Sequence, residues 1–197
     1  MISLARKVIR FELNMWRSLY AWARRRVRGQ GPGDLPVAYA NGASAIMWAF
    51  IVLNCLEIVA LHIMIPWETV RFLLDLLGVY SLVWFVGLLA AMKVHPHLVT
   101  GSGLRVRYGT SVDFTIPWES VVRAGTRIRS VEGFRTVRFD ESVVSVGISS
   151  QTNVDIVLHE PMVVQGKPVT EVRIFADDPK ALIAAVNSGR VAAVPGT

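Results

Sequence analysis

The chain has 197 residues, of which 52% are apolar and 18% charged, with a formal net charge of +6 and a mean hydropathy of +0.43. An ordinary soluble domain carries about 25% charged residues, so this composition favours a membrane protein. The single cysteine, Cys55, excludes an internal disulfide framework and a cysteine-rich metal site.

Residues 1–30 hold the excess positive charge, with eight basic side chains against Glu12 alone, a net charge of +7. At helical spacing, an apolar stripe opposes the basic residues. This stripe consists of Leu4, Val8, Phe11, Met15, Leu19 and Trp22, widened by Ile9, Leu13, Trp16 and Tyr20. The pattern predicts an amphipathic helix over 1–30 that lies among lipid headgroups. A helix packed on the rest of the protein is the alternative.

The arginines of this segment are the first candidate site. Each basic side chain near an anionic leaflet contributes about 1 kcal/mol to membrane binding. We therefore expect anionic lipid to contact seven residues: Arg6, Arg10, Arg17, Arg24, Arg25, Arg26 and Arg28. The Gly- and Pro-rich segment that follows, residues 31–42, predicts an elbow.

Two apolar runs of 23 residues each, 43–65 and 70–92, follow the elbow. At about 1.5 Å per residue, each is long enough to cross a hydrocarbon core of about 30 Å. Only residues 66–69 join them, which predicts an antiparallel transmembrane hairpin. A soluble helical hairpin is the alternative, but neither run has a polar face wide enough for water.

The charged flanks predict the orientation of this hairpin. Arginines precede the first run, and Lys93, Arg105 and Arg107 follow the second, whereas the turn offers only Glu68 and Arg71. By the positive-inside rule we expect a multi-pass protein of the inner (plasma) membrane with both termini cytoplasmic. A cleavable signal peptide is disfavoured, because the first apolar run starts late and is long.

Three polar residues inside the runs form a second candidate site: Glu57, His62 and Asp75. Ionisable groups in a membrane are costly and often functional. Glu57 is the deepest, about 12 Å from the outer end of its run at the standard helical rise, and is the candidate for a proton or partner site. The alternative is a structural role, in which the three side chains pair with Arg71 in one outer-leaflet cluster or snorkel to the surface.

From about residue 95 the pattern changes to period two. Leu104, Val106 and Tyr108 alternate with Arg105 and Arg107, and similar short strands continue to about residue 176. A helix then closes the chain, with Asp178 as its N-cap, Pro179 at its first position and Gly189 at its end. We expect six or seven strands in a small barrel or sandwich over 95–190, capped by this helix, and a flexible tail over 191–197.

Two segments, "GLRVRYGTSVDFTIPWESVV" and "EVRIFADDPKALIAAV", resemble the bacterial pleckstrin-homology (bPH) family. The first hairpin pattern of that family is matched by Leu104, Val106, Gly109, Ile116, Pro117, Trp118 and Val121. The chain is also similar to integral membrane proteins of actinobacteria. The resemblance covers roughly residues 40–190 and implies two packed antiparallel sheets capped by a helix, behind a transmembrane hairpin. It implies no catalytic residues.

The sequence carries no motif for a catalytic residue, a cofactor or a metal. It has no Walker loop, nucleophile elbow or His-Glu-x-x-His motif. His95 and His97 with His159 lack ligand spacing and are interpreted as juxtamembrane histidines rather than a metal site. Trp118 is interpreted as a core anchor. We expect no enzymatic activity.

A third candidate site is the arginine-rich stretch "RAGTRIRSVEGFRTVRFD". We expect lipid or partner binding by five residues in it: Arg123, Arg127, Arg129, Arg135 and Arg138. A solvated basic face is the alternative, because Glu132, Asp140 and Glu141 dilute the charge.

The sequence therefore favours a non-enzymatic, membrane-anchored interaction or scaffold subunit that presents a PH-like domain at the inner leaflet. Its expected partners are the anionic bilayer and either a membrane protein or a second copy of the chain. Recognition of anionic headgroups is the second hypothesis, and an accessory transport subunit using Glu57 is the third. Nucleic acid is disfavoured, because the basic segment is tied to a membrane span.

Overall fold

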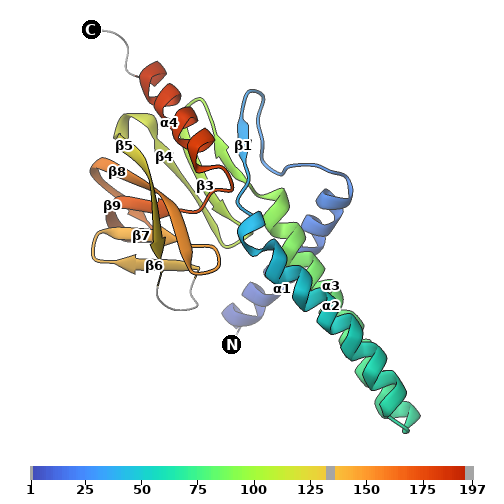
Figure 1. The fold of residues 1–197 in the computed structure, drawn as a ribbon. Helices are drawn as coiled ribbons and strands as arrows, with labels where there is room; N and C mark the ends of the chain where they lie inside the picture. The colour runs from blue at the N-terminus through green and yellow to red at the C-terminus, as the bar shows by residue number, and fades with distance from the viewer. Residues whose placement is uncertain (1, 132–135, 194–197) are drawn as a thin grey trace.

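The computed structural model describes the backbone of residues 2–131 and 136–193, and the side chains of residues 9, 11–131, 136–189 and 191. Figure 1 shows a long helical hairpin projecting from two sheets, with α1 crossing beside it. The helices are α1 (Ile2–Ala23), α2 (Asn41–Met64), α3 (Glu68–Val94), the 3-10 turn η1 (Trp118–Ser120) and α4 (Pro179–Ala193). The strands are β1 (Leu35–Val37), β2 (His97–Val99), β3 (Gly103–Tyr108), β4 (Val112–Pro117), β5 (Val121–Ser130), β6 (Val137–Asp140), β7 (Val143–Val146), β8 (Gln151–Val164) and β9 (Lys167–Ile174).

Helices α2 and α3 are long and apolar enough to cross a membrane. Each has a mean hydropathy of 2.1 in its most apolar window, and only 11% of that window is buried within the protein. The helices pack along their length, with Phe50 stacked on Phe85 at 5.7 Å between ring centroids. Gly78 lets them approach, because an added Cβ would lie 2.6 Å from Ile58. So much exposed apolar surface is unusual in a soluble monomer.

The predicted helix over 1–30 is too long, because α1 ends at Ala23. Arg25 adopts a left-handed conformation (φ 52°), which turns the chain out of the helix. The Arg25 N–H then donates to the Trp22 carbonyl and the Arg26 N–H to the Ala21 carbonyl. These two bonds form a Schellman motif, in which Arg25 occupies the position that usually carries glycine. The arginines from Arg24 onward therefore lie outside the helix.

The strands form two sheets in a sandwich-like arrangement. One sheet has the order β1-β2-β3-β4, and the other β5-β8-β9-β7-β6. β1 lies in the predicted elbow and pairs antiparallel with β2, so this segment is part of the β domain. The resemblance implies antiparallel sheets, but β7 and β9 run parallel. In the sheet order, β9 lies between β7 and β8. It pairs antiparallel with β8, the strand that precedes it in the chain, and parallel with β7 on its other edge.

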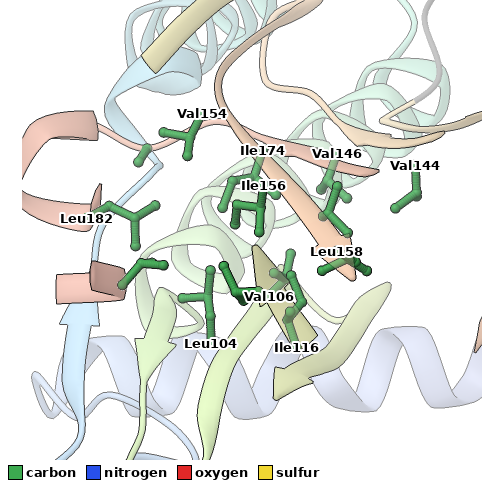
Figure 2. Close-up of a cluster of buried hydrophobic side chains, with 14 of the residues drawn as sticks. Leu104, Val106, Ile116, Val144, Val146, Val154, Ile156, Leu158, Ile174 and Leu182 are labelled. Atoms are coloured by element: carbon green, nitrogen blue, oxygen red, sulfur yellow. The ribbon is translucent and has the colours of Figure 1, made fainter. Parts of the chain in front are cut away.

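The core lies between the two sheets and α4 (Figure 2). Leu104, Val106 and Ile116 of one sheet meet Ile156 and Ile174 of the other, and all five are fully buried. Trp118 anchors the core, as predicted: it is 2% exposed and its indole N–H donates to the Thr100 carbonyl at 3.0 Å.

Helix α4 begins as predicted but does not end at Gly189. The Asp178 carboxylate accepts a hydrogen bond from the Ala181 N–H at 2.9 Å, as an N-cap does. Gly189 lies inside the helix, which continues to Ala193. An added Cβ at Gly189 would lie 2.6 Å from the Trp118 ring. This glycine therefore allows close packing on Trp118 rather than ending the helix.

The hairpin is attached to the β domain at the start of α2. The residue before this helix, Ala40, has no capping side chain, and the Asp177 carboxylate accepts the Asn41 N–H instead, at 3.1 Å. The Ser149 hydroxyl donates to the Gly42 carbonyl at 2.7 Å. An added Cβ at Gly42 would lie 2.8 Å from the Phe175 ring. Residues more than a hundred positions away thus cap and pack the first turn of α2.

Candidate functional site

The junction between the hairpin and the β domain contains a buried arginine, Arg107, on β3. Its side chain lies on the face of β3 opposite the core, where the segment after α1 and the end of α3 cover it, and it is only 2% exposed. Nε donates to the Pro96 carbonyl at 2.7 Å and Nη1 to the Arg28 carbonyl at 2.6 Å. Nη2 is buried and has no partner among the described residues. Burial lowers the pKa of Arg107, and the neighbouring Arg105 lowers it further.

His97 and Tyr39 pack beside Arg107 at the junction. The Arg107 backbone N–H donates to His97 Nδ1 at 3.1 Å, so the proton of the neutral ring lies on Nε2, which donates to the Phe175 carbonyl at 3.0 Å. Burial lowers the pKa of His97 to about 4. The Tyr39 ring packs on His97 at 4.8 Å between centroids. Burial also raises the pKa of Tyr39, whose hydroxyl accepts the Gly109 N–H. Both rings are therefore neutral at pH 7.

A polar cavity of about 280 Å³ opens beside Arg107 and is called the junction pocket here. It is lined by Asn14, Arg28, Gly29, His95, Arg105, Arg107, Gly109, Thr110, Val112 and Asp113. Asp113 is its one carboxylate, and Arg105 holds both oxygens, at 2.7 and 2.6 Å. The His95 Nδ1 lies 2.8 Å from the Ala91 carbonyl, and burial lowers the pKa of His95. Arg28 and Arg107 therefore give the pocket an excess of positive charge.

An apolar cavity of about 150 Å³, called the apolar slot here, adjoins the junction pocket. Its walls come from α1, α2, α3 and the β3–β4 turn: Phe11, Met15, Met47, Leu88, Ala91, Met92, Tyr108, Gly109, Thr110 and Ser111. Gly109 and Thr110 line both cavities. One site of the molecule thus places cationic groups next to an apolar groove.

The predicted N-terminal arginines divide into two groups. Arg17, Arg25 and Arg26 are exposed, and Arg24 lies over the Tyr20 ring at 4.6 Å. Arg28 is half-buried and lines the junction pocket. The side chains of Arg6 and Arg10 lie outside the described residues.

Helix α1 packs its first apolar stripe on α3 and leaves the second exposed. Phe11 contacts Trp84 at 5.8 Å between centroids, and Met15 is 3% exposed. An added Cβ at Gly87 would lie 2.5 Å from Met15, so α3 carries a glycine where α1 crosses it. The exposed stripe consists of Ile9, Leu13, Trp16 and Tyr20, each more than half exposed.

The arginines predicted on the later stretch lie among acidic partners. Arg123 and Arg127 are exposed on β5 and line one cavity with Asp155 and Glu171. Arg129 Nε donates to Asp155 at 3.1 Å. Arg138 lies on β6, and Arg135 lies outside the described residues. The described members follow strands β5 and β6 rather than one open loop.

The intramembrane candidates do not form one cluster. His62 Nδ1 and the Asp75 carboxylate lie 2.8 Å apart across the hairpin. Glu57 is exposed on α2. The structure thus joins two of the three predicted residues and leaves Glu57 on the outer surface of the hairpin.

His97 has no nitrogen left for a metal, because both ring nitrogens are hydrogen-bonded within the protein. Sequence reasoning missed Arg105, Arg107 and His95 as members of a site. The alternation of Arg105 and Arg107 with Leu104 and Val106 indicates a solvated strand face, and no local signal shows that residues 28–29 cover it. The adjacent Arg-Val-Arg and His-Pro-His motifs were the only available signal.

Comparisons with known proteins give no information on the function of the junction. No family model, curated protein or solved structure matches the chain. The resemblance to the bPH family therefore stays a prediction.

Proposed function

We propose that the chain is a two-span protein of the inner membrane that holds a PH-like β domain in a fixed orientation at the cytoplasmic leaflet, as a non-enzymatic scaffold for a membrane partner. The order of hairpin, sandwich and C-terminal helix supports this proposal. So does the apolar surface of α2 and α3, which a bilayer would cover.

The attachment of the β domain to α2 is the observation that carries the scaffold role. A domain tethered by a flexible linker would need none of the contacts that Asp177, Ser149 and Phe175 make with the first turn of α2. These contacts leave little freedom between domain and hairpin. A partner bound to such a domain would be held at a set height and angle above the membrane.

The exposed stripe of α1 supports the same placement. Trp16 and Tyr20 are aromatic residues of the type enriched at membrane interfaces. Arg17 and Arg24 lie beside them and would meet the phosphates. In this arrangement α1 lies at the boundary between headgroups and acyl chains, while its other face packs on α3 at Trp84 and Gly87.

Purification of the tagged protein from its native membrane in a gentle detergent, followed by mass spectrometry, tests the scaffold role. We expect one stoichiometric protein partner. Gly42→Leu should separate the β domain from the hairpin and lose that partner, while the variant stays in the membrane fraction. Gly101→Leu is the matched control, because no atom lies within 4 Å of a Cβ there. Recovery of wild-type protein without any stoichiometric protein would contradict the scaffold role.

Single-cysteine labelling of intact cells tests the topology. In a Cys55→Ser background, a cysteine at Thr69 should react with a membrane-impermeant maleimide, and one at Glu160 should react only after lysis. Both positions are exposed. Labelling of both sites in intact cells, or of neither, would rule out the proposed hairpin orientation.

A further inference from the structure

We propose that the junction pocket and the apolar slot together bind one anionic phospholipid of the cytoplasmic leaflet, with its phosphate beside Arg28 and Arg107 and an acyl chain in the slot. This inference rests on the membrane placement proposed above and assigns a specific ligand to the junction.

The charge of the pocket favours an anion. Arg107 is 2% exposed, and within the described part of the chain its guanidinium donates to two carbonyl groups, those of Pro96 and Arg28. A buried cation with no hydrogen-bonded counter-charge is costly, and Arg107 also keeps a buried Nη2 with no partner among the described residues. The carboxylates of Asp113 and Asp34 are near enough to favour its charged form, but the hydrogen bonds of the guanidinium go to carbonyl groups. The only lining carboxylate, Asp113, is already held at both oxygens by Arg105. A phosphate in the pocket would supply an anion in direct contact with the Arg107 guanidinium.

Backbone geometry keeps this pocket open. Gly29 adopts a left-handed conformation (φ 67°), and an added Cβ would lie 3.2 Å from Arg107 Nη1. A side chain here would crowd the guanidinium and occupy space beside it. The Arg28 backbone is fixed as well, because its N–H donates to the Val94 carbonyl at the end of α3. Arg28 therefore lines the pocket from a backbone position that is held against the end of α3.

The apolar slot makes the ligand an amphiphile rather than a free anion. It begins where the pocket ends, at Gly109 and Thr110. His95, directly after the end of α3, lines the pocket, and Leu88 of α3 lines the slot, a rise of about 10 Å over seven residues. The interfacial layer of a leaflet is about 5–8 Å thick, so a phosphate near His95 places its acyl chains near Leu88. Polar and apolar ends thus follow the order expected in a bilayer.

The other arginine-rich surface lacks both features. On sheet β5-β8-β9-β7-β6, Arg129 is paired with Asp155 and Arg173 with Glu171. The cavities there are lined mainly by polar and charged groups, and neither reaches the apolar helices. We therefore place the lipid at the junction.

Titration of delipidated protein with short-chain phosphatidylglycerol tests the site. Wild type should bind one molecule saturably, and more tightly than short-chain phosphatidylcholine or inorganic phosphate. Arg28→Ala should weaken this binding roughly tenfold, the effect of losing one charge-assisted hydrogen bond. This variant keeps the Arg28 carbonyl that Arg107 uses, so the fold should survive, as a thermal melt will check. Arg26→Ala removes the same charge from an exposed position outside the pocket and should leave the affinity unchanged.

A second variant tests the slot. Ser111→Trp should fill the slot and weaken phosphatidylglycerol binding without changing phosphate binding, whereas Ser142→Trp, on the exposed β6–β7 turn, should change neither. Equal losses in Arg28→Ala and Arg26→Ala would overturn the proposal in favour of diffuse surface charge. Phosphate binding as tight as that of phosphatidylglycerol would reassign the pocket to a free anion. If neither Arg28→Ala nor Ser111→Trp weakens phosphatidylglycerol binding, the lipid does not bind at the junction and the proposal is wrong.

The topology experiment separates this failure from that of the proposed function. Correct labelling of Thr69 and Glu160 together with a failed titration would reject the lipid site alone. Incorrect labelling would reject the membrane placement, and with it the cytoplasmic leaflet as the source of the lipid.

Discussion

The molecule has two groups of arginines, on β5 and at the junction, that differ in their burial and in the partners of their guanidinium groups. On β5, the exposed Arg123 and Arg127 lie near the carboxylates of Asp155 and Glu171. At the junction, Arg107 is buried, and the hydrogen-bond partners of its guanidinium among the described residues are carbonyl groups. The stretch that looks more basic in sequence is the one whose charge is largely balanced in space.

This difference shows that arginine density in a sequence is a poor guide to a binding site. Solvent and nearby carboxylates screen exposed charges, so they contribute little to fold or affinity. A single buried arginine without a carboxylate partner keeps its need for a counter-charge. The junction should therefore respond strongly to substitution and the β5 arginines weakly.

The largest effect is expected for Arg107→Leu. It leaves the carbonyls of Pro96 and Arg28 without donors, and at about 1–3 kcal/mol for each unsatisfied buried group we expect a loss of roughly 4 kcal/mol in the free energy of unfolding. Denaturant unfolding in detergent measures it. Arg129→Leu is the comparison, and equal losses in the two variants would remove the distinction between the two groups.

The second effect is a pH dependence centred on His97. Its pKa is about 4 in the folded protein against an ordinary value of 6.5, so between these values only the unfolded chain binds the proton. The stabilisation is present above pH 6.5 and is lost as the pH falls towards 4, by about 3 kcal/mol in total. Unfolding measured from pH 7.5 to 4 should show this slope. His97→Gln should reduce this slope without abolishing it, because burial also lowers the pKa of His95. The same change at the exposed His159 should leave the slope as it is, and an unchanged slope in His97→Gln would contradict the assignment.

A smaller effect is expected for Gly29→Ala. The residue has φ 67°, and its added Cβ would meet Arg107 Nη1 at 3.2 Å. Left-handed backbone strain alone predicts a loss of about 1 kcal/mol. Gly33→Ala, also at positive φ (86°) but with no atom within 4 Å, separates strain from crowding. A greater loss at Gly29 than at Gly33 would show that the space beside Arg107 matters.

The smallest effect is expected for the double variant Arg123→Ala, Arg127→Ala. Both side chains are exposed on β5, so the free energy of unfolding should change by less than about 0.5 kcal/mol. Phosphatidylglycerol binding by the delipidated protein should also stay at the wild-type level. A loss of binding comparable to that of Arg28→Ala would move the lipid site to β5.

The sequence predicted those elements whose signals are local. The two apolar runs became α2 and α3 with each boundary within two residues, because continuous apolar helices need no tertiary information. The Asp178 cap was likewise found, since its hydrogen bond spans three residues. Strand β1 was missed, because three residues in a Gly- and Pro-rich segment form a strand only where β2 offers an edge.

By itself, the sequence determined the apolar hairpin, the alternating strands, the closing helix and the position of every arginine. Only the tertiary structure decided which arginines matter together. It brought the Arg28 carbonyl into hydrogen-bond contact with Arg107, 79 positions later in the chain. The segment after α1 thereby covers a face of β3 that the alternating sequence predicts to be exposed to solvent. Burial and the choice of hydrogen-bond partners depend on which segments meet in space. Hydrophobic patterns of period two or 3.6 show only which face of a strand or helix a residue occupies.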